Sequence, residues 1–225
     1  MQRKETIVLL HGWGGSKKSL AALADELKKS FNVLNLELPG FGDTQEPKFV
    51  WGIKDYAKYV VEQAQKQGAY NFHLFGHSFG GQVAAQVALS DPDKLKKLIL
   101  CGAAVVRKKS GLIKLKIKTA KLLKNTPFPL ILSFLMRRSD YQKASPQMKK
   151  IMNKVLQEDL TQKLTQIKSP TLILWGEKDS YTSLPQAYLI HQKIPNSKLK
   201  IFKDLRHNLP LVKAKLVAEE IKKWI

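Results

Sequence analysis

One serine in this sequence, Ser78, lies where a short apolar run gives way to a helical pattern. It belongs to the stretch "FHLFGHSFGGQVA", and glycines stand two positions before it and two positions after it. If the chain reverses sharply at Ser78, Gly76 and Gly80 must lack side chains so that the two arms can pass closely. The serine oxygen would then project toward a ligand, as a nucleophile does. The same pattern is compatible with an ordinary tight turn, so the prediction depends on partner residues elsewhere.

A serine hydroxyl becomes a good nucleophile when a base removes its proton, and an imidazole suits that task at neutral pH. His207 follows the last predicted strand, and Asp179 lies four residues beyond Trp175 in the stretch "WGEKD". The order serine, aspartate, histidine along the chain is that of one hydrolase architecture and differs from the two common protease orders. We therefore predict that Ser78 is the nucleophile, that His207 is the base, and that Asp179 orients His207.

Acyl transfer also needs two preorganised donors for the oxyanion that forms on the substrate. One candidate is the backbone N–H of Phe79, at the start of the helix that follows the serine. The other is the backbone N–H of Trp13, in the stretch "HGWGG". The large ring of Trp13 is also expected to form a wall of the pocket.

Other titratable residues near the predicted strand ends compete for these roles. Asp43 follows "PGFG" and is expected to tie a loop, whereas Asp204 precedes His207 too closely to reach its far ring nitrogen. His11 and His77 are expected to brace the loops beside the serine. No group of cysteines and histidines has the spacing of metal ligands, so neither a metal nor another cofactor is expected.

Apolar runs of strand length alternate with helix-length segments along the chain. The predicted strands are Thr6–Leu10, Asn32–Glu37, Asn71–Phe75, Leu98–Cys101, Thr171–Trp175 and Leu199–Phe202. The predicted helices are Ser16–Lys29, Ile53–Gln67, Gly80–Leu89, Pro185–Gln192 and Val212–Trp224. This alternation predicts an α/β protein with a mostly parallel sheet of about six strands and helices on both faces. Ligands of such sheets bind beyond the carboxyl ends of the strands, where the three candidate residues fall.

These strand-end motifs resemble those of the α/β-hydrolase fold family, in particular small serine esterases or carboxylesterases with a helical cap. "HGWGG" is similar to the family's oxyanion loop, "GHSFGG" to its nucleophile elbow and "WGEKD" to its acid loop, and His207 stands where its catalytic histidine does. The leading antiparallel strands often present in the fold are missing, and Arg206 stands where a glycine usually precedes the histidine. The resemblance implies a hydrolase core of residues 1–103 and 169–225, with residues 104–168 inserted as a basic helical cap.

The resemblance implies hydrolysis of carboxylic esters through an acyl-enzyme, with small to medium apolar acyl groups. Serine rather than aspartate at position 78 argues against a haloalkane dehalogenase or an epoxide hydrolase. Lactones, thioesters and the carbon–carbon bond of a diketone are alternative substrates, and a lipid esterase acting at a membrane surface is a further alternative. A binding protein without catalysis is less favoured because all three triad residues are present.

Positive charge is concentrated in the predicted cap. The chain carries a net charge of +21, and residues 104–168 contain 16 lysines and arginines against three acids, a net of +13. These side chains are expected either to be solvated or to attract an anionic membrane surface or an acidic ligand. No nucleic-acid-binding motif accompanies the charge, so a nucleic-acid partner is not expected. The apolar run of residues 130–136 predicts an apolar pocket lined by Trp13, Phe134 and Met136.

Length and composition predict one domain with an insertion. The chain has 225 residues, of which 44% are hydrophobic, enough for one sizeable core. The lone cysteine, Cys101, rules out an internal disulfide and fits a reducing compartment. No run approaches the roughly 20 apolar residues of a membrane span, and the first residues lack a signal-peptide cleavage region. A cytoplasmic location and a small-molecule substrate are therefore expected.

Overall fold

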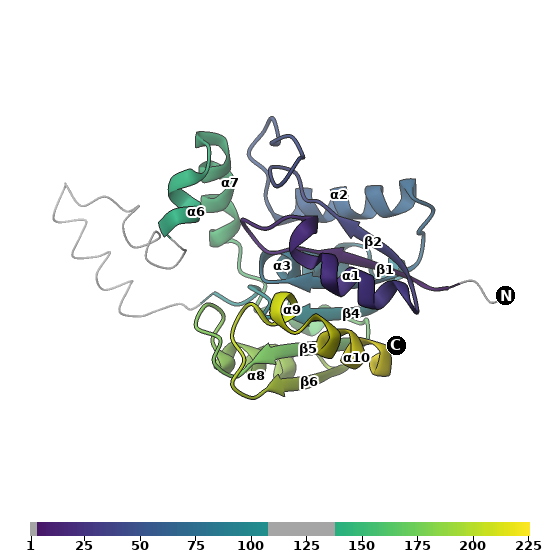
Figure 1. Cartoon of the computed structure of the whole chain (residues 1–225). Helices are drawn as coiled ribbons and strands as arrows, with labels where there is room; N and C mark the ends of the chain where they lie inside the picture. Colours follow the sequence, from purple (N-terminus) through teal and green to yellow (C-terminus); the bar gives the residue numbers. More distant parts are fainter. Residues whose placement is uncertain (1–3, 108–137) are drawn as a thin grey trace.

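Six strands lie side by side in one sheet, in the order β2-β1-β3-β4-β5-β6 (Figure 1). The computed structural model describes residues 4–107 and 138–225. The strands are β1 (Thr6–Leu10), β2 (Asn32–Leu36), β3 (Phe72–His77), β4 (Leu95–Cys101), β5 (Thr171–Gly176) and β6 (Ser197–Phe202). Every neighbouring pair is parallel, so the predicted α/β class with a parallel sheet is confirmed.

The burial of each strand explains its sequence. The central strands β3 and β5 are buried at every position, and they read as nearly continuous apolar runs because helices cover both faces. The edge strand β6 alternates exposed lysines with less exposed apolar residues, as one side chain in two points away from the core. The predicted strand boundaries lie within three residues of the observed ones.

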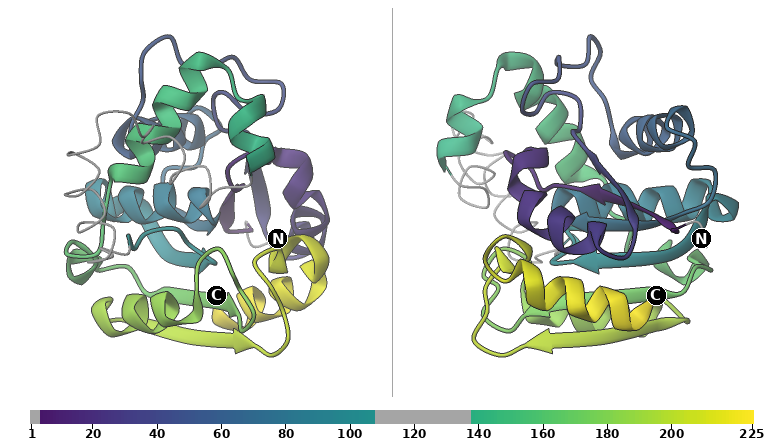
Figure 2. Two further views of the ribbon diagram at one scale, coloured as in Figure 1. Left: turned by 90° about the vertical axis from the view of Figure 1, so that its left-hand side faces the viewer. Right: turned by 45° about the vertical axis from the view of Figure 1, so that its right-hand side comes forward.

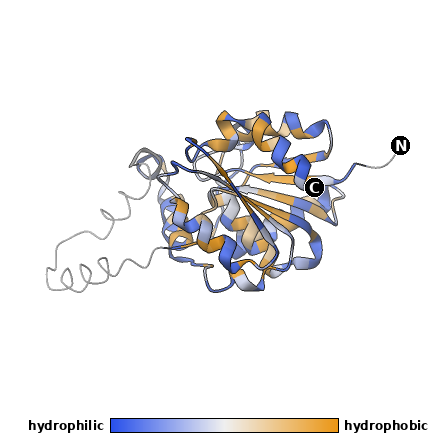
Figure 3. Ribbon diagram, turned by 90° about the horizontal axis from the view of Figure 1, so that it is seen from below, coloured by the Kyte–Doolittle hydropathy of each residue, from blue (hydrophilic) through white to orange (hydrophobic). Residues whose placement is uncertain are grey.

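Helices cover both faces of this sheet. On one face lie α2 (Ile53–Lys66), α3 (Phe79–Ser90) and α8 (Leu184–Lys193), and on the other lie α1 (Ala21–Lys28) and α10 (Ala214–Trp224), as Figure 2 shows. Four short helices lie between these longer elements: η1 (Lys17–Leu20), η2 (Pro92–Lys94), η3 (Leu164–Gln166) and α9 (Leu209–Val212). Each face has its own cluster of buried apolar side chains, and Figure 3 shows hydrophobic residues along the strands and helices that meet there.

Two predicted helices are divided in the structure. The predicted segment Val212–Trp224 is interrupted at Lys213, which leaves the helical region with φ −131° and ψ 44°. Val212 is the last residue of α9, and α10 forms the rest of the predicted segment. The predicted segment Ser16–Lys29 consists of the 3₁₀ helix η1 followed by α1. The other predicted helices agree with α2, α3 and α8 within one residue at each end.

The segment between β4 and β5 contains the described helices α6 (Arg138–Lys143) and α7 (Pro146–Gln157), which lie beyond one end of the sheet (Figure 1). Three buried residues of α7, Met148, Ile151 and Val155, belong to the same apolar cluster as α2 and α3. The predicted pocket residues Phe134 and Met136, with most of the basic stretch, lie outside the described residues. No described helix is both long enough and apolar enough to cross a membrane.

Candidate active site

Ser78 lies in the turn between β3 and α3, with the unusual backbone angles φ 55° and ψ −115°. A Cβ atom on Gly76 would clash with the backbone carbonyl of Gly80. A Cβ on Gly80 would lie 2.5 Å from the carbonyl oxygens of Leu10 and His11. The turn therefore brings the start of α3 against β1 and β3 so closely that side chains cannot fit, which confirms the steric expectation for this glycine-rich stretch.

The structure brings Ser78, His207 and Asp179 together. The Nε2 atom of His207 lies 3.0 Å from the Ser78 Oγ, and its Nδ1 lies 2.7 Å from Asp179 Oδ2. With Asp179 ionised, the Nδ1–H donates to the carboxylate, and Nε2 is left as an acceptor for the serine hydroxyl. The three side chains come from loops that follow three different strands, β3, β5 and β6. The arrangement can transfer a proton from the serine to the imidazole.

The carboxylate of Asp179 is buried but well supplied with hydrogen-bond donors. Its Oδ1 accepts the backbone N–H groups of Tyr181 at 2.8 Å and Thr182 at 2.9 Å, and its Oδ2 lies 2.8 Å from the Thr182 hydroxyl. Burial by itself would raise the pKa of Asp179, but the hydrogen bonds from His207 and Thr182 outweigh that effect and lower it. Asp179 is therefore a carboxylate at neutral pH.

His77 supports the loop that carries His207. Its Nε2–H donates to the backbone carbonyl of His207 at 2.8 Å, and the two rings lie 4.9 Å apart. Burial lowers the pKa of His77 to about 3, so the ring is neutral. The expectation that His77 braces a loop is confirmed.

His11 joins the loops that follow β1 and β2. Its Nδ1–H donates to the carbonyl of Gly12 at 2.8 Å, and its Nε2 accepts the backbone N–H of Leu38 at 3.1 Å. Burial lowers the pKa of this imidazole, which keeps it neutral. The bracing role expected for His11 is thus confirmed as well.

The competing acids lie away from the serine. The carboxylate of Asp204 pairs with Lys178 at 2.5 Å, and both side chains are more than half exposed. Asp43 donates its backbone N–H to Glu37 at 3.1 Å, while its own side chain is exposed. The loop is therefore tied through the backbone of Asp43 and the carboxylate of Glu37, a contact that the sequence analysis did not predict.

The backbone N–H groups of Trp13 and Phe79 fit the expected oxyanion donors. Within residues 4–107 and 138–225, neither N–H donates a hydrogen bond to another group. The rings of the two residues pack edge to face, 5.1 Å apart, which fixes the loop after β1 against the start of α3. Their role as oxyanion donors stays a prediction.

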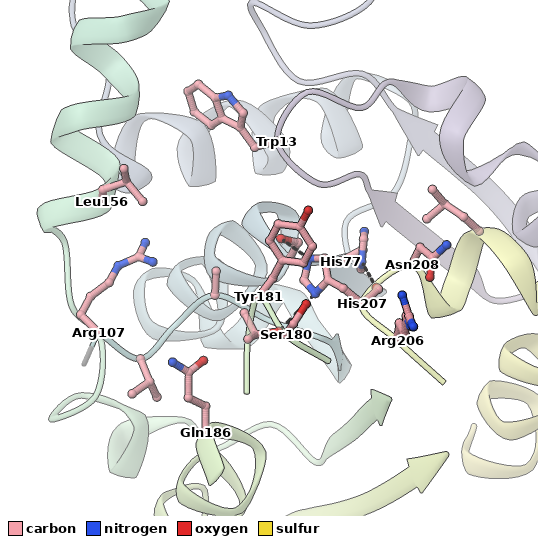
Figure 4. A pocket seen from close by; sticks show the side chains of 15 residues that line it. Trp13, His77, Arg107, Leu156, Ser180, Tyr181, Gln186, Arg206, His207 and Asn208 are labelled. Carbon is pink, nitrogen blue, oxygen red and sulfur yellow. Dashed lines mark hydrogen bonds between the residues drawn. The ribbon is translucent and has the colours of Figure 1, made fainter. Parts of the chain in front are cut away.

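Two adjoining cavities open beside Ser78. The larger, of about 550 Å³, extends toward Tyr181, Arg206 and Leu211, and the smaller, of about 60 Å³, lies against Phe79, Met152 and Val155. Both are lined by Trp13, Ser78, Ala104, Arg107 and Leu156. Figure 4 shows the larger cavity with Trp13 on one side, as predicted for a wall of the pocket.

Two residues of this site were not predicted from the sequence. The Thr182 hydroxyl contacts the Asp179 carboxylate. In the sequence, this contact is indicated only by the position of Thr182 three residues after Asp179, a spacing typical of turns closed by a side chain. Arg107 lines both cavities but reads in sequence as the first residue of the basic run "RKKS". With Arg206 and Gln186 it adds polar side chains to the described lining of the larger cavity, whereas the expected apolar residues Phe134 and Met136 lie outside the described residues.

Comparisons with known proteins agree with this fold. Residues 1–211 match the family described as serine aminopeptidase, S33. An uncharacterized hydrolase of Bacillus subtilis, YugF, is 24% identical over 99% of this chain and 90% of its own length. Lipase 1 of Psychrobacter immobilis is 27% identical over 93% of this chain and 73% of the lipase.

Among solved structures, a membrane phospholipase A described as a bacterial virulence factor is similar to this chain with a TM-score of 0.80 and 25% identity. The match covers 100% of this chain and 79% of the phospholipase. The family match extends over most of the sequence and includes Ser78 and His207. The chain therefore belongs to the serine aminopeptidase S33 family of α/β hydrolases.

Proposed function

We propose that this protein is a serine hydrolase that cleaves carboxylic esters through an acyl-enzyme on Ser78. The observation that carries the proposal is the unbroken series of hydrogen bonds from Asp179 through His207 to Ser78, beside a cavity large enough for a substrate. The similarity to Lipase 1 supports an ester as the substrate.

In the first half of the reaction, the Ser78 Oγ gives its proton to His207 Nε2 as it bonds to the carbonyl carbon of the ester. Asp179 stabilises the imidazolium that results. The substrate's carbonyl oxygen becomes an oxyanion and accepts the N–H groups of Trp13 and Phe79. His207 then protonates the alcohol oxygen, which leaves with the electrons of the broken C–O bond. In the second half, a water molecule gives a proton to His207 Nε2 as its oxygen bonds to the acyl carbon. His207 then returns that proton to the Ser78 Oγ, which leaves with the electrons of the broken C–O bond and releases the carboxylic acid.

The two adjoining cavities beside Ser78 suit the two parts of an ester. The smaller, walled by Phe79, Met152 and Val155, is assigned to a small or medium apolar acyl group. The larger takes the alcohol part or a longer chain. Residues 104–168 are assigned the role of a cap, because Leu156 and Arg107 from this segment line both cavities.

A second candidate is a lipid esterase that acts at an anionic membrane surface. It is favoured by the similarity to the membrane phospholipase A and by the net charge of +21, because basic residues near an anionic surface contribute about 1 kcal/mol each. Lactones, thioesters and diketones are further possible substrates of the same triad.

The test combines covalent labelling with an ester panel. A fluorophosphonate probe should label the protein at Ser78, and acetyl, butyryl and octanoyl esters should be hydrolysed. Ser78→Ala should abolish labelling and lower the rate by about 10⁴-fold or more, because the triad acts as a unit. The matched control is Ser90→Ala, because Ser90 lies at the far end of α3, the helix that follows Ser78, and lines neither cavity.

The outcomes separate the candidates. Near wild-type turnover by purified Ser78→Ala would refute the assignment of the nucleophile. Labelling at Ser78 without hydrolysis of any ester would direct the search to lactones, thioesters and diketones. Strong activation of octanoyl ester hydrolysis by phosphatidylglycerol vesicles, with no effect of phosphatidylcholine vesicles, would favour the membrane-surface esterase.

A further inference from the structure

The site contains a guanidinium group for which the reaction described above has no use. Arg107 follows β4, and its side chain lines both cavities beside Ser78 (Figure 4). Its Nη2 atom donates to the Gln82 side-chain oxygen at 2.7 Å and to the Val155 carbonyl at 3.2 Å. Among the described residues no acceptor pairs with Nη1, and Nε is buried without a partner. Within residues 4–107 and 138–225, three of the five N–H donors of this side chain therefore have no partner.

Arg107 keeps its charge in this position. Burial lowers its pKa to about 10, and the nearby charges of Asp159 and Glu158 act in the opposite direction, so the group is protonated at neutral pH. In the part of the chain that the structure describes, no carboxylate lies within 4.0 Å of the guanidinium.

The carboxylates of the two nearby acids accept backbone N–H groups rather than the guanidinium. Glu158 accepts the backbone N–H of Ile53 at 2.7 Å, and Asp159 accepts those of Thr161 at 2.9 Å and of Arg107 at 3.4 Å. A partly buried cation without a paired anion is costly, because water no longer solvates it fully. An anionic group that entered the cavity would remove that cost.

The rest of the larger cavity has the same character. Its described lining contains a second arginine, Arg206, and no aspartate or glutamate. Figure 4 shows Arg107 and Arg206 at two sides of the cavity, with Tyr181 and His207 between them in this view. A cavity lined by two arginines and no acid favours an anionic ligand over a neutral or cationic one.

Resting on the proposed ester hydrolysis, we infer that Arg107 selects substrates that carry an anionic oxygen group, a carboxylate or a phosphate, on the acyl or the alcohol part. The two N–H groups of Arg107 Nη1, which have no partner among the described residues, bind that group while the ester carbonyl lies at Ser78. Charge-assisted hydrogen bonds from arginine are the strong ones, and they give specificity through geometry as well as charge. Arg107 is thus a residue that determines specificity and takes no part in the proton transfers.

The experiment measures a ratio of kcat/KM values for pairs of substrates, one with an anionic group and one without it. On the acyl side, 4-nitrophenyl monoglutarate is compared with 4-nitrophenyl pentanoate, in which a methyl group replaces the terminal carboxylate. On the alcohol side, the butyryl ester of glycolate and 2-phosphoethyl butyrate are each compared with ethyl butyrate. The pair with the largest ratio identifies the side of the ester and distinguishes a carboxylate from a phosphate.

The wild-type protein should prefer the anionic member of one pair. Arg107→Met should lower that ratio by about 10- to 100-fold, which is the usual effect of losing a hydrogen bond to a charged group. Arg107→Lys should give an intermediate ratio because it keeps the charge and loses the planar donors. The control Lys154→Met removes one exposed positive charge from α7, outside both cavities, and should leave the ratio unchanged.

Two results would overturn the inference. One is a wild-type protein that prefers the neutral member of every pair. The other is an Arg107→Met variant that loses activity equally on anionic and neutral esters, as expected if Arg107 only ties Gln82 to α7. If Arg107→Met does not fold, the inference is still tested by the wild-type ratios and by whether Arg107→Lys lowers the preference for the anionic ester. Failure of the proposed function looks different, because wild-type protein would then hydrolyse neither member of any pair.

Discussion

At the scale of single residues, the state of Asp179 decides whether Ser78 can be activated. One carboxylate oxygen of Asp179 accepts two backbone N–H groups, and the other accepts His207 Nδ1–H and faces the Thr182 hydroxyl. All four partners can donate a hydrogen bond, which suits an ionised carboxylate because it only accepts. Since the carboxylate accepts from His207 Nδ1, the ring proton stays on Nδ1, and Nε2 is left to take the serine proton.

Replacement of that carboxylate by an amide should therefore reverse the tautomer. In Asp179→Asn the amide oxygen would keep the two backbone N–H groups, and the amide NH₂ would face His207. The imidazole would then carry its proton on Nε2 and could not act as a base. We expect kcat to fall by about 10³- to 10⁴-fold with KM little changed, measured on a butyryl ester.

Asp204→Asn is the matched control, because the same substitution on a nearby loop affects only an exposed pair with Lys178. It should leave kcat close to the wild-type value. Greater damage from Asp204→Asn than from Asp179→Asn would show that the acid has been misassigned.

At the scale of elements, the end of α7 is joined to the start of α2. The Glu158 carboxylate accepts the backbone N–H of Ile53 at 2.7 Å, and the Lys154 ammonium donates to the carbonyl of Val50 at 3.0 Å. The first N–H groups of a helix have no partner within the helix, and the positive end of its dipole favours an anion. Glu158 therefore stabilises α2 and holds the end of α7 against it.

Glu158→Ala should lower the free energy of unfolding by about 1 to 3 kcal/mol, because an N–H loses a charged acceptor at a helix N-terminus. Urea unfolding followed by circular dichroism measures the change. Glu62→Ala, which removes an exposed carboxylate further along α2, should change stability by less than about 0.5 kcal/mol. Equal effects of the two substitutions would mean that the contact between α7 and α2 contributes nothing to stability.

At the scale of the whole molecule, buried neutral histidines make stability depend on pH. Burial lowers the pKa values of His11, His73 and His77, the last to about 3. Between that value and about 6.5, the unfolded chain binds protons that the folded chain does not. For His77, this contribution to stability is complete above about pH 6.5 and falls as the pH drops below it, by about 1.4 kcal/mol per pH unit. The burial of His11 and His73 acts in the same direction.

His77→Asn should reduce this sensitivity to acid. The loss of unfolding free energy between pH 7 and pH 5 should be smaller in the variant than in the wild type by about 2 kcal/mol, as measured by urea unfolding at both values. His191→Asn, which replaces an exposed histidine, is the control and should behave like the wild type. The same pH dependence in all three proteins would refute the idea that His77 is held neutral by burial.

Much of this molecule could be predicted from local patterns. Strands such as β1 and helices such as α2 follow from apolar spacing within a few residues, and parallel strands place their carboxyl ends at one edge. That rule placed Ser78, Asp179 and His207 near one another before any distance was known, and the structure brings them within hydrogen-bonding distance. Their catalytic roles stay predictions.

Contacts between distant segments could not be predicted in this way. Arg107 meets Val155 across 48 positions, and Glu158 meets Ile53 across 105, and nothing in either local sequence indicates the partner. In the printed sequence Arg107 is one basic residue among many. Its burial beside Ser78, without a paired carboxylate in the described residues, depends on how α7 packs over the carboxyl edge of the sheet. Spacing along the chain therefore predicts which residues can do the chemistry, whereas packing decides the surroundings of each charge and hence the substrates that fit.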